Sequence, residues 1–240
     1  MPSKELLIVV PARGGSKGLP RKNARTLGDI PLLGWTAEAV KKSGLSEATC
    51  LLSTDDEEIA EIGRKLGLDV PFIRPPELAG DNATAEAVVL HALDWMTQKT
   101  GAMAGLVMLL QPTSPFRSPE VLSQAVKMLE DPAIDGIISV KPIYRCLATL
   151  FYTDENMRLL PLDKGGELKA RRQEVDPIYT PNGALYLIRS EKLRETKSFF
   201  LGKCRGIEMD QITSIDIDDA LDWKVAESVV ANKLTWRNQL

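Results

Sequence analysis

Apolar and polar residues alternate in blocks over the first 140 residues, in a strand–helix order. Short, wholly apolar runs between turn residues are typical of strands that a parallel sheet buries on both faces. Segments with apolar residues every three or four positions, bounded by Gly, Pro or capping residues, predict covering helices. The predicted strands are residues 6–10, 48–53, 70–73, 106–110 and 136–140, and the predicted helices are 31–43, 56–66, 84–100 and 119–129, the last capped by Ser118.

This alternation predicts one α/β domain over residues 1–240, built as a three-layer, mostly parallel Rossmann-like sheet. Ligands of such sheets bind beyond the carboxyl ends of the strands. Four polar groups follow predicted strands directly and should lie at that edge, namely Arg13, Thr54-Asp55, Arg74 and Gln111.

The pattern breaks at about residues 141–179, where no helical period continues. The turn sequence at 163–166 favours an inserted subdomain that carries a hairpin, and a long surface excursion is the alternative. The core then resumes with an apolar run at 183–188, an extended segment at 214–218 and a last helix at about 219–231.

Composition adds limits on location and partners. The chain is 44% hydrophobic and 26% charged, with a net charge of −3, which is typical of a globular protein without a nucleic-acid or anionic-membrane surface. Cys50, Cys146 and Cys204 are odd in number and far apart, which argues against disulfides and a zinc site. Since no apolar run approaches about 18 residues, we expect a cytoplasmic protein.

The most informative segment is the glycine-rich loop at 11–23, which follows the first predicted strand. Its glycines let backbone N–H groups approach an anion, and its cations add positive charge, so the loop predicts a polyphosphate site. The glycines are Gly14, Gly15 and Gly18, and the cations are Arg13, Lys17, Arg21 and Lys22. The spacing fits neither a Walker loop nor a dinucleotide fingerprint. The alternative is a solvated basic loop.

A second feature is the pair Asp216 and Asp218 in the sequence Ser-Ile-Asp-Ile-Asp-Asp. In an extended chain their carboxylates lie on one side, about 7 Å apart, and suit Mg²⁺. The alternative is capping of the last helix, which we assign to Asp219 and which leaves Asp216 unexplained because it lies too far upstream.

The loop at 11–23 resembles, almost residue for residue, the first motif of the acylneuraminate cytidylyltransferases, the CMP-sialic acid synthetase family. The resemblance implies that Gly14, Gly15 and Lys17 belong to a loop around the CTP triphosphate. It implies triphosphate contacts for Arg13, Ser16, Lys22 and Asn23. It also implies that Asp216 and Asp218 hold the catalytic Mg²⁺.

The same resemblance extends over most of the chain. It implies a cytosine pocket at Arg74, a contact between Gln111 and the acceptor sugar, and a dimer made by the insertion. Thr84 would either contact the base or cap the following helix. The only histidine, His91, is expected to be structural.

The resemblance also implies an acceptor side that binds an acidic sugar. Arg172 and Gln173 would meet the carboxylate, and the segment Asn182, Gly183 and Ala184 would hold polar groups of the sugar. Tyr186, Phe199 and Phe200 would form an aromatic wall around an N-acyl group, with core packing as the alternative.

These features predict a Mg²⁺-dependent enzyme that transfers CMP from CTP to the anomeric hydroxyl of a nine-carbon 2-keto sugar acid and releases pyrophosphate. Candidate acids are N-acetylneuraminate, KDN, legionaminate and pseudaminate. Arg13 and Lys22 would stabilise the pyrophosphate charge, and Asp216 is the candidate base. The alternatives are a CMP-Kdo synthetase, a sugar-1-phosphate nucleotidylyltransferase and a non-catalytic scaffold. All of this requires the cations to lie within about 15 Å of Asp216 and Asp218.

Overall fold

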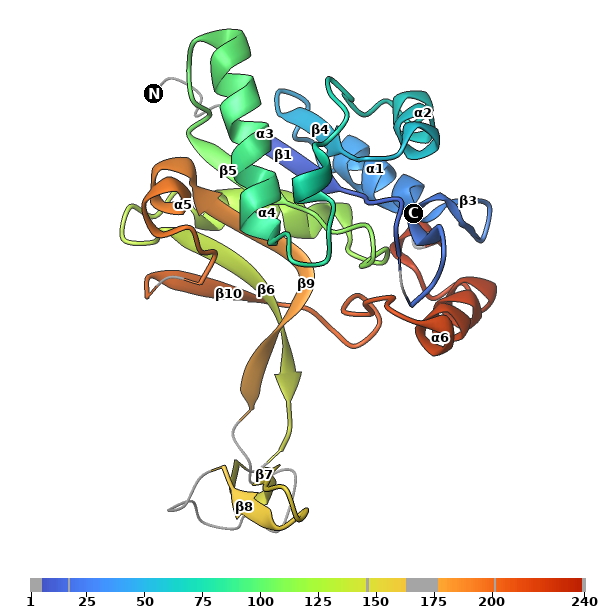
Figure 1. The fold of residues 1–240 in the computed structure, drawn as a ribbon, viewed down its shortest axis with the longest axis vertical. Coiled ribbons are helices and arrows are strands. Elements are labelled where there is room, and N and C mark those ends of the chain that lie inside the picture. Colours follow the sequence, from blue (N-terminus) through green and yellow to red (C-terminus); the bar gives the residue numbers. More distant parts are fainter. Residues whose placement is uncertain (1–5, 17, 146, 163–176, 201, 239–240) are drawn as a thin grey trace.

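Six strands form the central sheet of this computed structural model, which describes residues 6–16, 18–145, 147–162, 177–200 and 202–238. They are β1 (Leu6–Pro11), β4 (Thr49–Ser53), β5 (Leu106–Leu109), β6 (Gly136–Ile143), β9 (Ile178–Arg189) and β10 (Cys204–Glu208). Their order is β10-β6-β9-β5-β1-β4 (Figure 1). Only β9 runs antiparallel to its neighbours, β5 and β6. The predicted mostly parallel α/β sheet is therefore confirmed.

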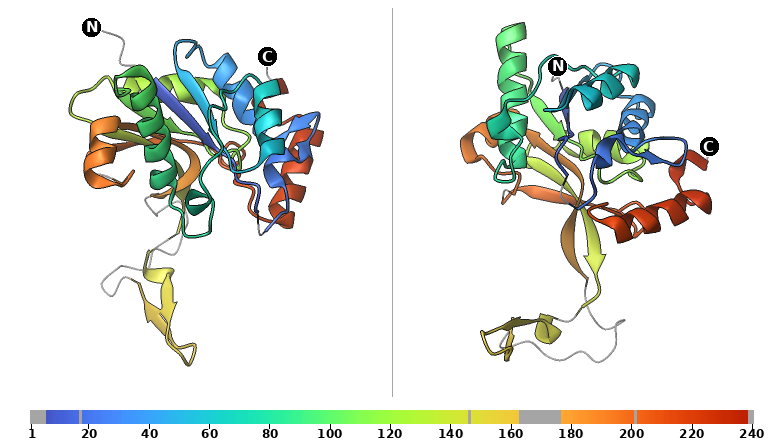
Figure 2. Two further views of the ribbon diagram at one scale, coloured as in Figure 1. Left: turned by 45° about the horizontal axis from the view of Figure 1, so that its top comes forward. Right: turned by 45° about the vertical axis from the view of Figure 1, so that its right-hand side comes forward.

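Helices cover both faces of the sheet (Figures 1 and 2). The helices are α1 (Leu32–Lys42), α2 (Glu57–Lys65), α3 (Ala85–Thr100), α4 (Pro119–Met128), α5 (Ser190–Thr196) and α6 (Ala220–Ala231). Ile8 and Val10 of β1 pack into one buried cluster with residues of α1, α2 and α4. Leu7 and Val9 face the opposite cluster with α3 and α5. This alternation along a single strand produces the three layers.

A third buried cluster attaches α6 to the body of the protein. Trp223 of α6 packs there with Trp35 of α1 and with Trp236, in the short 3₁₀ helix at Trp236–Asn238. Trp35 contacts Trp236 edge to face, with ring centroids 6.4 Å apart. The C-terminal region is thereby fixed beside the N-terminal half of the sheet.

The helix predictions match the structure to within one or two residues, and the caps explain the boundaries. Asp56 accepts a hydrogen bond from the Ile59 backbone N–H at 3.0 Å at the start of α2. Asp219 caps α6 in a capping box with Asp222, as assigned. Ser118 occupies the N-cap position of α4, but its side chain makes no capping hydrogen bond within the described residues, so that part of the prediction is wrong.

The predicted strand at 70–73 is also wrong. The segment pairs with β4 through an isolated bridge at Asp69, and the chain then leaves the sheet. Pro71 follows almost at once and has no N–H to continue a ladder. The Arg74 N–H instead donates to the carbonyl of Thr54 at 2.7 Å, which holds Arg74 beside the end of β4. Helix α5 and the edge strand β10 were not predicted.

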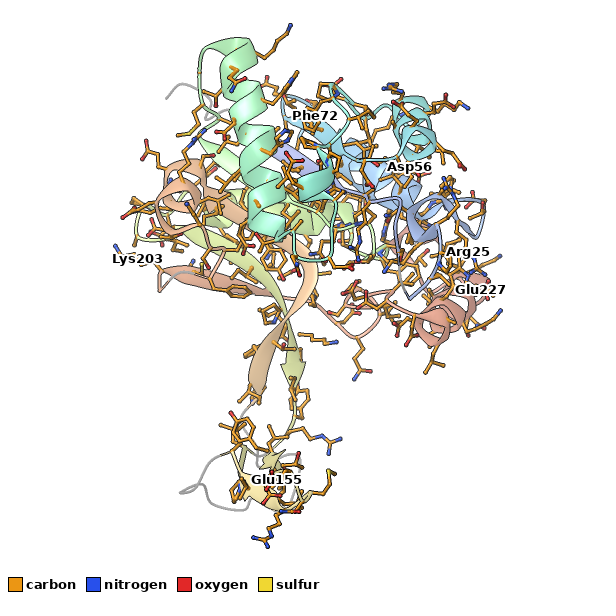
Figure 3. All side chains as sticks on the ribbon, viewed as in Figure 1. Arg25, Asp56, Phe72, Glu155, Lys203 and Glu227 are labelled. Atoms are coloured by element: carbon orange, nitrogen blue, oxygen red, sulfur yellow. The ribbon has the colours of Figure 1, made fainter. Side chains whose placement is uncertain are left out.

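The break at 141–179 corresponds to an arm that leaves the body. Strands β6 and β9 continue as an antiparallel pair out to Ile143 and Ile178. Beyond them β7 (Phe151–Thr153) pairs antiparallel with β8 (Leu159–Pro161), which forms a hairpin within the insertion. The turn sequence at 163–166, on which the hairpin prediction rested, lies outside the described residues. Figures 1 and 2 show this hairpin standing apart from the body, and Figure 3 places Glu155 in its turn.

The remaining short elements are β2 (Thr26–Leu27) with β3 (Ile30–Pro31), and the 3₁₀ helices η1 (Lys22–Ala24), η2 (Pro76–Leu78) and η3 (Leu147–Thr149). Among the described residues, every helix is too short or too polar to cross a bilayer.

Candidate active site

The loop after β1 is tied back to the sheet at both ends. The Ala12 N–H donates to the carbonyl of Ser53 at 3.0 Å, and the Asn23 side chain donates to the carbonyl of Arg13 at 3.1 Å. Lys22 and Asn23 lie in η1 and are buried. These contacts and their burial hold the two side chains in fixed positions.

The same loop meets the C-terminal aspartates, although about 195 residues separate them in sequence. Lys22 Nζ lies 3.2 Å from Asp218 Oδ1 and also donates to the carbonyl of Ile217. A Cβ at Gly18 would lie 2.2 Å from the carbonyl oxygen of Asp218, so only glycine permits this approach. The contact between Lys22 and Asp218 is well inside the 15 Å that the sequence-based hypothesis allows.

A cavity of about 350 Å³ lies between the loop and the carboxyl ends of β1 and β5. Most of the predicted nucleotide and metal residues line it together. They are Arg13, Ser16, Lys22, Asn23, Arg74, Thr84 and Asp218. Gln111, a predicted acceptor residue, also lines the cavity, whereas Asp216 is not among its described lining residues. Lys17 lies outside the described residues. The structure therefore gathers, in one cavity, residues that the sequence spreads over more than 200 positions.

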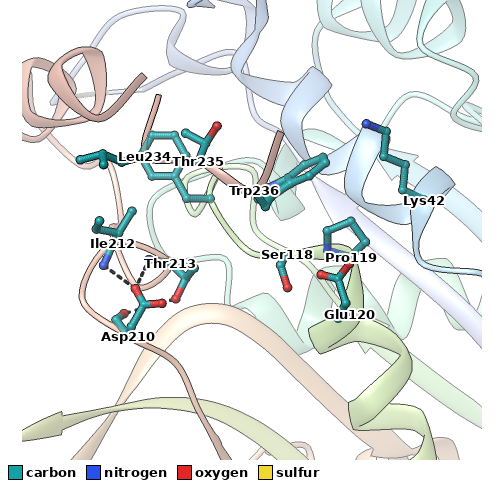
Figure 4. A pocket seen from close by; sticks show the side chains of 11 residues that line it. Lys42, Ser118, Pro119, Glu120, Asp210, Ile212, Thr213, Leu234, Thr235 and Trp236 are labelled. Atoms are coloured by element: carbon teal, nitrogen blue, oxygen red, sulfur yellow. Dashed lines mark hydrogen bonds between the residues drawn. The ribbon is translucent and has the colours of Figure 1, made fainter. Parts of the chain in front are cut away.

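A larger cavity of about 710 Å³ lies elsewhere and has none of the predicted site residues among its described lining (Figure 4). Lys42, Glu120 and Trp236 border it, and Asp210 accepts hydrogen bonds from two backbone N–H groups at its edge. Its charged side chains are of mixed sign. The smaller cavity is the candidate active site because it holds the convergent cations and carboxylates.

Asp55 follows Thr54 just after β4. It connects the predicted triphosphate loop with Arg74, the residue of the predicted cytosine pocket; these two segments are called the nucleotide side below. Its Oδ1 accepts from the Gly14 N–H at 3.1 Å and from Arg74 Nη2 at 3.3 Å. Arg74 is only 4% exposed; burial lowers its pKa, and the Asp55 carboxylate acts in the opposite direction. The sequence placed Asp55 at this edge of the sheet but gave it no role.

Two other predicted nucleotide residues have protein partners. Arg13 Nη1 pairs with Asp81 Oδ1 at 3.0 Å across the mouth of the cavity. Thr84 Oγ1 accepts from the Ala87 N–H at 3.2 Å, so the N-cap alternative is confirmed for this residue, which also lines the cavity. Gly14 is constrained as well, since a Cβ there would lie 2.6 Å from Asp56 Oδ2.

Asp216 and Asp218 lie in an extended segment, with Ile217 between them fully buried. Asp216 Oδ1 is buried without a hydrogen-bond partner among the described residues. Burial raises the pKa of Asp216 and Asp218 adds to the rise, whereas a Thr113 hydrogen bond and the Lys22 charge act in the opposite direction. The described residues contain no cluster of three or more metal-ligating side chains. The unpartnered oxygen of Asp216 and the exposed carboxylate of Asp218 are the kind of ligands that Mg²⁺ takes when phosphates supply the rest.

The predicted acceptor residues approach the same aspartate. Gly183 has φ +80°, and a Cβ there would lie 3.2 Å from both Asp216 Oδ2 and Gln111 Oε1. Glycine suits this position because another residue would be strained at that φ and its Cβ would crowd both side chains. Gln111 and Asp216 therefore lie close to each other around Gly183, at the end of β5 and beside the middle of β9.

Asn182 lies beside this group, but its side chain is buried and already bonded within the protein. Its Oδ1 accepts from Ser139 Oγ at 2.5 Å and from the Ala184 N–H at 3.2 Å, and its Nδ2 donates to Ser214 Oγ at 2.9 Å. The arrangement fixes the backbone around Gly183. A direct contact between Asn182 and the sugar stays a prediction.

The predicted aromatic wall is partly assembled. Tyr186 lies 5.3 Å from the ring of Phe199 and 6.1 Å from that of Phe200. Phe199 is buried, whereas Phe200 is 60% exposed, so core packing explains the first but not the second. Arg172 and Gln173 lie outside the described residues. His91 packs edge to face on Phe72, 4.7 Å between centroids, in keeping with a structural role.

Arg117 was missed by the sequence analysis. It is 0% exposed and donates to Thr36 Oγ1 at 2.7 Å, to the carbonyl of Gln111 at 2.6 Å and to the carbonyl of Ala184. Burial lowers the pKa of Arg117 to about 9, and the Asp216 charge acts in the opposite direction. The sequence did hold a signal for Arg117. It is a charged residue next to the apolar Phe116, in the turn that begins at Gln111, the predicted sugar contact.

Comparisons with known proteins show which sequences and folds this chain resembles. A family model described as cytidylyltransferase matches residues 7–203. The CMP-N,N'-diacetyllegionaminic acid synthase of Legionella pneumophila is 34% identical over 226 residues, 94% of this chain and 96% of that protein. The N-acylneuraminate cytidylyltransferase of Escherichia coli O18:K1:H7 is 32% identical over 238 residues, 95% of this chain but 53% of that protein. The chain thus spans about half the length of the second relative.

A solved structure of CMP:2-keto-3-deoxy-manno-octonic acid synthetase complexed with CTP superposes with a TM-score of 0.67. The similarity covers 95% of this chain and 99% of that chain at 15% sequence identity. At that identity the match supports the fold alone.

Proposed function

The chain belongs to the acylneuraminate cytidylyltransferase family, and we propose that it transfers CMP from CTP to the anomeric hydroxyl of a nine-carbon 2-keto sugar acid, with release of pyrophosphate. The observation that carries the proposal is the contact between Lys22 and Asp218. It brings the glycine-rich loop and Asp218, one of the two aspartates, to one cavity, and nucleotidyl transfer needs both cations for phosphate and carboxylates for a metal ion.

On the nucleotide side, the cations would bind the triphosphate and the buried Arg74 would face the cytosine. Arg13 and Lys22 would stabilise the charge that grows on pyrophosphate as the bond to the α-phosphorus breaks. Ser16 and Asn23 line the cavity beside them and would contribute neutral donors. Both cations now pair with carboxylates, and we expect phosphate oxygens to replace part of those contacts.

We propose that Asp216 and Asp218 hold Mg²⁺, because a buried, unpartnered oxygen of Asp216 lies beside the exposed carboxylate of Asp218. Bound there, Mg²⁺ would supply neutralisation of phosphate charge and a lower pKa of the attacking hydroxyl. Asp216 is also our candidate to accept the hydroxyl proton. Lys22, close to Asp218, would keep the carboxylate pair oriented toward the triphosphate.

On the acceptor side, Gln111 and the backbone around Gly183 would position the sugar for in-line attack. Such positioning provides a large share of the rate enhancement in phosphoryl transfer. We propose that Arg172 and Gln173 of the insertion bind the carboxylate of the acid. Phe200, with its 60% exposed ring, would pack against an N-acyl substituent together with Tyr186.

We further propose that the chain acts as a cytoplasmic homodimer in which the inserted subdomain at about 141–179 contacts a second subunit. The exposed apolar side chains of the hairpin support this proposal. Tyr152, Leu159 and Leu160 are 63%, 62% and 47% exposed. Sedimentation of the full chain should give a dimer, and a monomer at micromolar concentration would contradict this proposal.

The decisive experiment measures pyrophosphate release from CTP and Mg²⁺ with a panel of acids. The panel contains N-acetylneuraminate, KDN, legionaminate, pseudaminate and Kdo. We expect turnover with at least one of the four nine-carbon acids and a kcat lower by about 100- to 1,000-fold in Lys22→Ala. Lys224→Ala on the surface should match the wild type. Turnover with Kdo alone would favour the CMP-Kdo synthetase alternative, and silence across the panel would favour a non-catalytic scaffold.

A further inference from the structure

Arg117 lies directly behind the acceptor side of the cavity and is completely buried. Within the described part of the chain, its hydrogen bonds all go to neutral oxygens. These are the hydroxyl of Thr36 in α1, the carbonyl of Gln111 after β5 and the carbonyl of Ala184 in β9. One guanidinium group therefore joins three separate elements.

Two of these three bonds hold the backbone of predicted sugar-binding residues. Gln111 presents its side-chain oxygen to Gly183, and Ala184 directly follows Gly183. The planar fork of arginine fixes the two carbonyls relative to each other, which a flexible ammonium group does poorly. The distance from Gln111 Oε1 to Gly183 thus depends on Arg117.

Stability is a weak explanation for this arrangement. A buried charge whose hydrogen bonds go to neutral oxygens is costly, and the Asp216 charge opposes the effect of burial without reversing it. Hydrophobic residues of similar volume are often neutral or better at such a position. The pKa of Arg117, lowered to about 9 by burial, reflects that cost and still leaves the group protonated at neutral pH. The contacts of Arg117 point instead to a role in shaping the acceptor side.

We infer that Arg117 is a positioning residue for the acceptor sugar acid: it locks the turn at Gln111 to β9 so that Gln111, Gly183 and Asp216 face a single acceptor. The inference rests on the proposed function. Within the described part of the chain, the hydrogen bonds of Arg117 go to Thr36, Gln111 and Ala184 and not to the loop at 11–23, so Arg117 should affect the acid far more than CTP.

The test is steady-state kinetics of the full-length protein with CTP and the sugar acid varied separately. We expect Arg117→Met to raise the KM for the acid and to lower kcat. Together these changes should reduce kcat/KM for the acid by about 10- to 100-fold. The KM for CTP should stay within about twofold. Arg117→Lys should recover part of the loss because it keeps the charge and some donors.

Arg189 offers a matched control. Its guanidinium also donates to backbone carbonyls, those of Ile134, Leu129 and Asp131 at 3.0, 3.1 and 3.2 Å, at the opposite end of β9. Arg189→Met should lower Tm without separating the two KM values. If Arg117→Met does not fold, Thr36→Val removes one bond to Arg117 and should raise the KM for the acid about two- to tenfold, with CTP unaffected.

Three results would overturn the inference. The first is a folded Arg117→Met variant with an unchanged KM for the acid. The second is an equal change in the KM values for the acid and for CTP that follows the loss of Tm. The third applies if Arg117→Met does not fold, and is an unchanged KM for the acid in Thr36→Val. Failure of the proposed function is distinct from all of these, since it appears as a wild-type protein that uses none of the acids. That result would refute both.

Discussion

The nucleotide side and the acceptor side of the candidate site are held together by different interactions. On the nucleotide side, charged groups pair across the cavity. Arg13 and Asp81 are 38% and 51% exposed at their side chains, and Lys22 pairs with a 77% exposed Asp218. Exposed ion pairs such as Arg13–Asp81 contribute about 0–1 kcal/mol, so these partners exchange readily. The side chain of Lys22 is only 9% exposed, and the replaceable part of its pair is the exposed carboxylate of Asp218.

On the acceptor side, buried groups bond to neutral partners. Asn182 links Ser139 and Ser214, and Arg117 links the backbone of Gln111 and β9. Leaving one of these buried groups unpaired costs about 1–3 kcal/mol, so this network resists rearrangement. The comparison teaches that buried hydrogen bonds already hold the backbone around Gln111 and Gly183 in place on the acceptor side. On the nucleotide side, the cations are paired with carboxylates that phosphate oxygens can replace.

The largest effect should come from the carboxylate pair. Asp218→Ala should reduce Mg²⁺-dependent turnover to background and leave the fold intact, because the side chain is 77% exposed. Pyrophosphate release at increasing Mg²⁺ concentration checks this, with Asp94→Ala on the surface of α3 as control. An unchanged magnesium titration would remove Asp218 from the proposed site.

The cations of the loop should come next. Arg13→Ala or Lys22→Ala should cost about 2.7–4 kcal/mol of transition-state stabilisation, or about 100- to 1,000-fold in kcat, by analogy with the loss of one charge-stabilising donor. Lys22→Ala should also lower Tm, since Lys22 is buried and binds the carbonyl of Ile217. Near-wild-type kcat in both variants would exclude the loop from catalysis.

A smaller effect, mainly on stability, should follow from Asn182→Ala. The change leaves the buried Ser139 and Ser214 hydroxyls without this partner and should cost about 1–3 kcal/mol of unfolding free energy. Thermal unfolding should shift down by about 2–4 °C per kcal/mol. Asn232→Ala, which removes an exposed amide bonded to Ser228, is the control. Equal Tm values for the two variants would show that the acceptor network is not rigid.

The smallest effect should come from Asp81→Asn, which weakens a pair that Arg13 must exchange for phosphate. Releasing Arg13 should lower the KM for CTP by about two- to fivefold at low salt, and the difference should fade as ionic strength rises. Asp94→Asn, in a similarly exposed pair with Arg194, should leave this KM unchanged. A raised KM for CTP in Asp81→Asn would mean that Asp81 helps to bind the nucleotide.

Local patterns in the sequence were sufficient for much of the fold. The apolar run at β1, the caps at Asp56, Thr84 and Asp219, and the break at about residue 141 each leave a signal within a few residues. The pairing of strands leaves a weaker signal in the sequence. The expected strand at 70–73 is apolar, yet its chain leaves the sheet after Asp69, and the edge strand β10 has an irregular pattern that gave no prediction.

The candidate site divides in the same way. The loop at 11–23 and the Asp216–Asp218 pair could be recognised because the residues of each motif are neighbours in the sequence. Their residue types also indicate a ligand: glycine amides and cations suit phosphate, and carboxylates suit magnesium. Asp55 and Arg117 could not be assigned roles, because each acts on groups at least five residues away, through contacts that depend on the packing of several elements.

The sequence by itself thus determined the order of most helices and strands. It also indicated a phosphate site near the N-terminus and a metal site near the C-terminus, since both predictions depend only on neighbouring residues. Tertiary structure alone decided that Gly18 passes within reach of Asp218, that Gly183 brings Gln111 and Asp216 together, and that one buried guanidinium holds the acceptor side. These outcomes depend on close approach between distant segments, and the steric fit that permits it exists only once the sheet has assembled.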